Sequence, residues 1–189
     1  MIDGHMKDLL QEAEEHMEKS MDWLRTELNG IRAGRATPSM VENIRIDYYG
    51  SQTPLNQLAS ISAPQADLLI VQPWDRSVLP QVEKGIMAAN MGLNPNNDGT
   101  FIRIPVPPLS EERRRDLAKT VRSKGEEAKI AVRNIRRDIK ERIKKIADEE
   151  SLSEDMRYES EERLQSITDD YVQRIDHLLD RKEEEIMEV

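Results

Sequence analysis

The sequence predicts an α+β fold, an elongated antiparallel three-helix bundle interrupted by a small inserted β/α/β domain. Residues 1–30, 110–150 and 153–188 place apolar side chains every three or four positions, a spacing typical of amphipathic helices. Residues 31–109 instead alternate apolar and polar side chains and contain all nine prolines of the 189-residue chain. This switch in pattern indicates a β-rich module inside an otherwise helical chain.

Residues 1–30 predict the first helix of the bundle. No proline or interior glycine interrupts the pattern before Gly30, and the segment has a net charge of −5. Its apolar side chains recur at coiled-coil-like spacing and therefore form one face. They are Leu10, Ala13, Met17, Met21, Leu24, Leu28 and Ile31.

Residues 31–109 predict short strands around one short helix. Alternation over residues 44–48 indicates a half-buried strand that ends at Tyr49-Gly50. Residues 58–63 and 68–72 predict two more strands, and residues 101–106 predict another after the turn at residues 97–99. Asp75 or Ser77 is expected to cap a helix that Gly92 ends. The apolar side of that helix is expected to comprise Leu79, Val82, Ile86 and Ala89.

Residues 110–150 and 153–188 predict two helices on the order of 50–60 Å long, at about 1.5 Å per residue. Ser110 and Ser153 are the expected N-caps, each followed directly by acidic residues in the first turn. Gly125 is the one weak helix former inside the first of these helices. Because each apolar stripe needs partners, residues 1–30 are expected to complete a three-helix bundle.

The expected domains are a discontinuous bundle of residues 1–32 and 108–189 and an inserted domain of residues 33–107. Two crossings, near residues 31–36 and 105–109, connect them. A module joined by two short strands of chain is free to pivot, so a hinge is expected there; a rigid contact between the domains is the alternative. The expected hinge residues are Ala33, Gly34, Pro105, Val106, Pro107 and Pro108.

Charge is distributed unevenly along the chain. The formal net charge is −9, yet residues 113–145 carry fourteen basic and five acidic side chains, a local net charge of +9. Residues 151–189 have a net charge of −8. At about 100° per residue, one group of these cations shares a helix face, on which Glu126 is the one acid. This basic face comprises Arg115, Arg122, Lys129, Arg133, Arg136, Lys140 and Lys144.

Two interpretations of the basic face remain open. Its cations either pair with the acidic helices on both sides, in surface ion pairs of little energy each, or they face outward and bind a phosphate backbone. The dense run Arg133-Asn134-Ile135-Arg136-Arg137 favours RNA contact. Arg32 and Arg35 flank the first crossing, where they either contact phosphates or tie the hinge.

The exposed or buried state of the aromatic residues is also open. Trp74 is expected to pack in the core of the inserted module, with contact to a partner as the alternative. Trp23 is expected in the bundle core or on its flank. Tyr48 and Tyr49 could stack on bases, although a strand end before Gly50 explains at least one of them.

The sequence favours a binding factor over an enzyme. With no cysteine, disulfides, thiol nucleophiles and Cys-ligated metals are excluded. The three histidines are scattered, and no glycine-rich phosphate loop or nucleophile elbow is present. No cofactor or metal is expected. No apolar run approaches the roughly 20 residues of a membrane span, so a cytoplasmic protein without membrane contact is expected.

Several motifs occur in order and closely resemble the bacterial ribosome recycling factor family, a likeness that runs from about residue 7 to the C-terminus. The motifs are residues 31–38 (IRAGRATP), 48–50 with 53–55 (YYG, TPL), 72–75 (QPWD), 92–95 with 98–99 (GLNP, DG), 108–114 (PLSEERR) and 131–138 (AVRNIRRD).

The resemblance implies an L-shaped molecule of near-tRNA dimensions that binds the post-termination ribosome in the intersubunit space as a monomer. With elongation factor G, and GTP hydrolysis by that partner, the family splits the ribosome into subunits and releases mRNA and tRNA. Arg133 and Arg136 match positions that contact ribosomal RNA, with Arg137, Lys129, Lys140 and Arg122 as neighbours. Arg32 and Arg35 match positions at the hinge that also face ribosomal RNA. A coiled-coil adaptor or chaperone-exchange helper is the alternative, and it predicts no ribosome association.

Overall fold

The computed structural model describes residues 4–89 and 92–188. The chain divides into two compact units, each with its own core. One unit contains the N-terminal residues through Ala33 together with the chain from Glu111 onward; the other, the module, is Gly34–Ser110.

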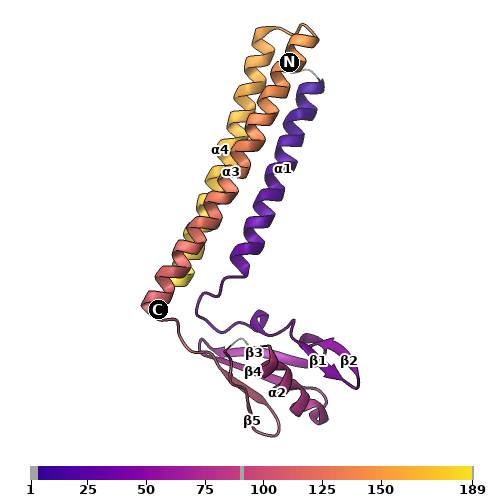
Figure 1. Ribbon diagram of the computed structural model, residues 1–189, viewed down its shortest axis with the longest axis vertical. Helices are drawn as coiled ribbons and strands as arrows, with labels where there is room; N and C mark the ends of the chain where they lie inside the picture. Colours follow the sequence, from indigo (N-terminus) through magenta and orange to yellow (C-terminus); the bar gives the residue numbers. More distant parts are fainter. Residues whose placement is uncertain (1–3, 90–91, 189) are drawn as a thin grey trace. The chain divides into compact units, whose positions relative to one another are not determined.

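Three long helices form the first unit. They are α1 (Gly4–Asn29), α3 (Glu111–Glu149) and α4 (Glu154–Met187), and they run side by side as a bundle (Figure 1). A tight turn reverses the chain between α3 and α4. In it Ser151 takes a φ of +51°, and the Ser153 hydroxyl caps α4 by accepting from the Met156 N–H at 3.2 Å. Within the described ranges, no helix combines the length and apolar character needed to cross a membrane.

The bundle core consists of two clusters of buried side chains in sequence along the helices. One cluster includes Met17, Leu24, Val132 and Ile175, and the other includes Leu9, Ile139, Ile143 and Leu164. The 3.6-residue period expected from the sequence thus places the same apolar stripes inward on all three helices.

Side chains of α1 also bind the other two helices through charged hydrogen bonds. Arg142 of α3 donates to both carboxylate oxygens of Glu12, at 2.6 and 2.8 Å. On the α4 side, Glu18 accepts from the Tyr171 hydroxyl at 2.9 Å and from Arg174 at 3.2 Å. These contacts fix the position of α1 along the bundle, since each needs one particular register.

The module contains a hairpin and an antiparallel sheet. Strands β1 (Arg45–Tyr48) and β2 (Ser51–Pro54) pair in the hairpin. Strands β3 (Ala59–Gln65), β4 (Leu68–Pro73), β5 (Asn96–Asn97) and β6 (Ile102–Pro105) form the sheet in the order β3-β4-β6-β5. Helix α2 is Leu79–Ala88, and short 3₁₀ turns occupy Pro38–Met40, Leu55–Gln57 and Arg76–Val78.

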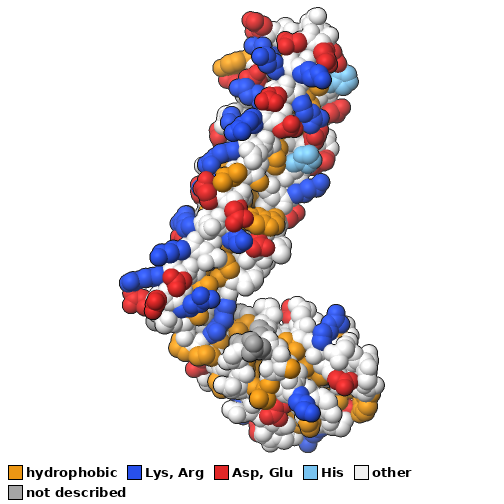
Figure 2. All heavy atoms as spheres, viewed as in Figure 1, with side chains coloured by type: hydrophobic (Ala, Val, Ile, Leu, Met, Phe, Trp, Pro, Cys, Tyr) orange, Lys and Arg blue, Asp and Glu red, His pale blue; other side chains and the backbone are white. Residues whose placement is uncertain are grey.

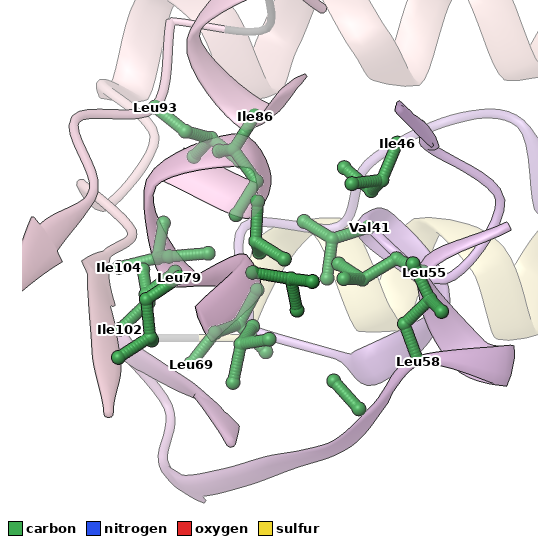
Figure 3. Close-up of a cluster of buried hydrophobic side chains, with 14 of the residues drawn as sticks. Val41, Ile46, Leu55, Leu58, Leu69, Leu79, Ile86, Leu93, Ile102 and Ile104 are labelled. Carbon is green, nitrogen blue, oxygen red and sulfur yellow. The ribbon is translucent and has the colours of Figure 1, made fainter. Parts of the chain in front are cut away.

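The module core gathers side chains from the hairpin, the sheet and α2 around one interior (Figure 3). Ile46 of β1, Leu69 of β4 and Ile104 of β6 are fully buried there, as are Val41 and Leu55 from the connecting turns. The burial alternates along β4, with Leu69, Val71 and Pro73 inward.

The predicted fold class is confirmed: a bundle of α1, α3 and α4 carries an inserted sheet domain. The sequence pattern does not predict β2 or the two-residue β5, since neither strand alternates apolar and polar side chains. The helix expected near Asp75 begins four residues later, because Asp75 instead caps a 3₁₀ turn by accepting from the Ser77 N–H at 2.9 Å. The expected apolar position Ala89 is wrong; it follows the last residue of α2 and is exposed.

The expectation that Trp74 packs in the module core is also wrong. The side chain of Trp74 is 69% exposed. The reason is the two-residue period of β4: Pro73 takes the inward position, and Trp74 follows on the outward side shared with Gln72. Trp23 lies on the flank of the bundle, 38% exposed, with the Lys124 ammonium 5.6 Å from its ring centre.

Candidate nucleic-acid interface

The orientation of the basic face is set by how α3 packs on α4. Val121, Ala128 and Val132 are fully buried, so the cations between them are held to the remaining sides of the helix. Gly125 brings the two helices close: a Cβ at this position would lie only 2.2 Å from Cδ1 of Leu179. The glycine that looked like a weak point is therefore a close-packing site.

Part of the basic face pairs with carboxylates of α4. The pairs run in antiparallel order: between Arg122 and Lys129 the cation advances seven positions along α3, and the partner goes back seven along α4, from Glu183 to Asp176. The pairs are Arg122 with Asp180 and Glu183, Lys129 with Asp176, and Lys140 with Glu161. The hydrogen bond to Glu183 raises the pKa of Arg122 above its ordinary value, because the carboxylate stabilises the charged guanidinium.

Arg136 occupies the same row but meets a neutral partner. Its Nη1 donates to Oε1 of Gln165 at 3.2 Å, where the neighbouring cations of the row meet carboxylates. The Gln165 amide in turn donates to Asp169 at 2.8 Å. An amide satisfies the hydrogen bond of Arg136 without cancelling its charge, so positive charge remains here.

Two further arginines extend this region outward. Arg133 is 50% exposed and contacts Glu126 of its own helix at 3.2 Å, so the single acid on the basic face has one partner. Arg137 is exposed, and no ion pair of its side chain is recorded within the described residues. Arg133, Arg136 and Arg137, called the central arginines below, therefore form the part of the face best able to receive phosphates.

The ion-pair interpretation of the basic face therefore holds for only some of its residues. Arg122, Lys129 and Lys140 join α3 to α4, whereas the central arginines are less neutralised. The visible side of the bundle interleaves Lys and Arg with Asp and Glu along its length, as this pairing requires (Figure 2). The α4 partners were missed in the sequence, although the seven-residue spacing of Asp176 and Glu183 matches that of Lys129 and Arg122.

The crossings are anchored at one place in the module. The Ala36 N–H donates to the Ala66 carbonyl and the Val106 N–H to the Asp67 carbonyl, both at 2.7 Å. Gly34 has a φ of +87°, and a Cβ there would lie 3.3 Å from Leu109. The entering and leaving segments therefore lie against each other at the turn between β3 and β4.

These contacts limit the backbone that could act as a hinge to fewer residues than expected from the sequence. Pro105 ends β6 and Val106 is fully buried, so both belong to the module. On the entering side Ala33 packs against the bundle core. Arg35 is exposed and Arg32 is half-buried. The backbone left between the two cores is Gly34–Arg35 and Pro107–Ser110.

Comparison with known proteins identifies the family. The family model described as ribosome recycling factor matches residues 24–187. The chain belongs to the ribosome recycling factor family. Relatives include ribosome-recycling factors of Salinibacter ruber, 55% identical over 189 residues and 100% of both chains, and of Halalkalibacterium halodurans, 50% identical over 183 residues, 97% of this chain and 99% of the other.

Solved ribosome recycling factors have the same fold. A solution structure of one is 41% identical, covers 100% of both chains and superposes with a TM-score of 0.78. A second solved chain is 43% identical, with a TM-score of 0.64, covering 99% of this chain and 100% of the other. Its structure holds models of the T. thermophilus ribosome recycling factor and the E. coli elongation factor G bound to the E. coli post-termination complex.

Proposed function

We propose that the chain binds the post-termination ribosome and, together with elongation factor G, splits it into subunits, releasing mRNA and tRNA. The observation that carries this proposal is the 55% identity to a ribosome-recycling factor over the whole of both chains. A related chain is bound with elongation factor G to a post-termination complex. As a family member the chain is a non-enzymatic translation factor of the bacterial cytoplasm, so GTP hydrolysis belongs to the elongation factor.

In this proposal the central arginines bind ribosomal RNA. Arg136 lies where α4 supplies Gln165 instead of a carboxylate, Arg137 is exposed, and Arg133 has Glu126 as its one carboxylate partner. The three together therefore keep positive charge that is available to phosphates. Arg122, Lys129 and Lys140 act differently: they hold α3 against α4 and so present Arg133, Arg136 and Arg137 on a straight, rigid helix. Arg32 and Arg35 contribute a second group of cations at the entering crossing.

The proposed motion is a rotation of the module about Gly34–Arg35 and Pro107–Ser110 while the bundle stays bound. Each crossing is short, and each is fixed at both ends by a packed core. A force applied to the module by the elongation factor is therefore transmitted to the bundle and the RNA it holds.

The test measures cosedimentation with large ribosomal subunits at two salt concentrations and splitting of post-termination ribosomes by light scattering. The wild-type chain is expected to bind and to split only when elongation factor G and GTP are present. Arg133→Glu with Arg136→Glu should weaken binding at least tenfold and lower its salt dependence, by about 0.7–0.9 in logarithmic slope per lost phosphate contact.

Arg122→Gln is the matched control for this test. It removes a cation of the same face whose charge is already paired with Asp180 and Glu183. Its salt slope should equal that of the wild type. Equal binding by the wild type and the double reversal would refute the RNA assignment, and a wild type that neither binds nor splits ribosomes would refute the function.

A further inference from the structure

The module exposes two large aromatic side chains that lie outside its buried core. Tyr49 is 78% exposed and Trp74 is 69% exposed, in a chain with only four tyrosines and two tryptophans. The Tyr49 hydroxyl lies 3.3 Å from Oδ2 of Asp75, the residue that follows Trp74, so both aromatics belong to one region of the module. Exposed aromatics in one region typically mark contact surfaces, because their burial against a partner removes much apolar area from water.

Tyr49 occupies a backbone position that disfavours tyrosine. The hairpin turn between β1 and β2 consists of Tyr49 and Gly50, with φ values of +49° and +83°. Both central residues of such a turn need positive φ, for which Asn-Gly is the favoured pair. A tyrosine in this conformation costs on the order of 1 kcal/mol or more, and nothing in the turn itself requires its ring. Its presence therefore points to a use outside the hairpin.

The Tyr49 ring is held in place before any partner arrives. Its hydroxyl lies 3.3 Å from Oδ2 of Asp75 and 3.2 Å from Oγ of Ser77, and its ring contacts the edge of Tyr48 with centres 4.7 Å apart. Trp74 precedes Asp75 in the chain, and the backbone N–H of Trp74 donates to the Leu58 carbonyl at 3.2 Å. Side chains and backbone fixed in this way lose little entropy on binding.

The charge around Tyr49 indicates what kind of partner fits. A shallow hollow of about 250 Å³ beside the ring is lined by Asp47, Tyr49, Gly50, Ser77, Val78 and Gln81. This lining carries a carboxylate and no lysine or arginine. Hydrogen bonds from Ser77 hold the pKa of the adjacent Asp75 carboxyl below its ordinary value, so it stays charged. Arg76, exposed between Asp75 and Ser77, is the one cation of this segment, so the two carboxylates Asp47 and Asp75 leave the region net negative. Such a region repels RNA phosphates and attracts a cationic side chain, which also gains from the tyrosine ring.

We propose that Asp47, Tyr49, Trp74, Asp75 and Ser77, called the Tyr49 patch, are the docking surface of the module for a lysine- or arginine-bearing segment of elongation factor G. The proposal rests on the proposed function and assigns to particular residues the contact by which the elongation factor acts on the module. The aromatic rings supply the buried area, and Asp47 and Asp75 supply the charge that selects a cation.

The central variant is Tyr49→Asn, which removes the ring and restores the favoured Asn-Gly turn. Its thermal stability should equal or exceed that of the wild type, so loss of function cannot be ascribed to unfolding. In splitting of post-termination ribosomes titrated with elongation factor G, the half-maximal concentration of the elongation factor should rise at least fivefold. Trp74→Ala should act in the same direction, and the two together should exceed tenfold.

Two further variants separate charge from shape. Asp47 accepts a hydrogen bond from the Gly50 N–H at 2.9 Å, and Asp47→Asn keeps an oxygen for that bond while removing the charge. For this variant we expect the half-maximal concentration of elongation factor G to rise two- to fourfold. Tyr158→Asn is the matched control, because Tyr158 is a 64% exposed tyrosine of α4 outside the patch. It should leave the titration unchanged.

Cosedimentation of each variant with ribosomes, without elongation factor G, should match the wild type. The proposal would be overturned if the Tyr49→Asn and Trp74→Ala chains were folded and needed no more elongation factor G for half-maximal splitting than the wild type does. So would an equal loss of ribosome binding in the absence of the elongation factor, since the patch would then contact the ribosome. A wild-type chain that fails to split ribosomes would instead count against the proposed function.

Discussion

At the level of single residues, the neutral amide of Gln165 decides where positive charge remains on α3. Elsewhere along the same row, Arg122, Lys129 and Lys140 meet carboxylates of α4. A row of identical ion pairs would have given a tighter bundle but no site for phosphate. One amide in place of one carboxylate thus distinguishes the paired cations from Arg136, to which we assign phosphate binding.

Gln165→Glu should convert Arg136 into another paired cation. We expect little change in thermal stability, since the new exposed ion pair contributes well under 1 kcal/mol while the hydrogen bond from the Gln165 amide to Asp169 is lost. We expect a three- to tenfold loss of affinity for large ribosomal subunits. Asp169→Asn, which changes charge on α4 without facing Arg136 directly, is the control. Unchanged affinity in Gln165→Glu would contradict the role given to the amide.

Carboxylates of α1 predict how stability depends on pH. The hydrogen bond from Arg25 holds the pKa of Glu18 below its ordinary value of 4.5, with help from Tyr171 and Arg174, and Arg142 does the same for Glu12. A carboxylate whose pKa is lowered by folding stabilises the chain above its unfolded pKa and loses this effect as pH falls through its folded pKa.

The melting temperature should therefore be level above about pH 5 and fall as the pH is lowered from there towards 3. Glu18→Gln should melt lower at pH 7 and show a shallower fall on acidification, because the neutral amide has no proton to gain. Melting followed by circular dichroism from pH 3 to 7 checks this. Parallel curves for the two chains would contradict it.

At the level of elements, the contact of α3 with α4 depends on the space left by Gly125. The added Cβ of Gly125→Ala would also lie 2.9 Å from Cγ of the buried Leu179, so the helices must shift. We expect a loss of about 1–2 kcal/mol in the free energy of unfolding.

The same substitution should have the opposite sign once Leu179 is shortened. In a Leu179→Ala background, Gly125→Ala should raise stability by about 1 kcal/mol, because alanine favours the helix and no longer meets the leucine. Urea unfolding of the four chains measures this cycle. The same effect in both backgrounds would show that Gly125 does not serve close packing.

The elements follow from the sequence to different degrees. The three long helices are predictable, because their apolar period persists over many turns. The strand β2 is not, since Ser51, Gln52, Thr53 and Pro54 gain their structure from pairing with β1. The residue type of Trp74 favours a place in the core, and its outward orientation follows only from the inward position of Pro73, the residue before it. The division of the basic face needs the α4 register, a long-range contact that no local pattern reports.

At the level of the whole molecule, the net charge of −9 combines helices of opposite charge, a basic α3 and an acidic α4. Carboxylates of the acidic α4 pair with Arg122, Lys129 and Lys140 and leave the central arginines less neutralised, which in the proposed function restricts RNA binding to one region. Binding by a chain with this total charge is therefore local, and strongly dependent on salt.

The hinge is tested by Gly34→Ala. Its positive φ and its approach to Leu109 make a side chain there strained and crowded, so the first crossing should stiffen or shift. We expect ribosome binding within twofold of the wild type and splitting slowed at least threefold. Gly99→Ala is the control: Gly99 also has positive φ, +90°, but nothing lies within 4 Å of its Cβ position. Equal splitting rates in both variants would contradict the hinge.

The anchoring of both crossings at Ala66 and Asp67 also has a consequence for the order of folding. Helices α3 and α4 are joined by a short turn and need little loop closure to pair, whereas α1 is separated from them by the whole module. Once the module folds, Gly34 and Leu109 are already in contact, so the chain between α1 and α3 closes at the entropic cost of a short loop. The hairpin of α3 and α4 should therefore form early and α1 should dock last, so that a destabilised module delays completion of a bundle it does not belong to.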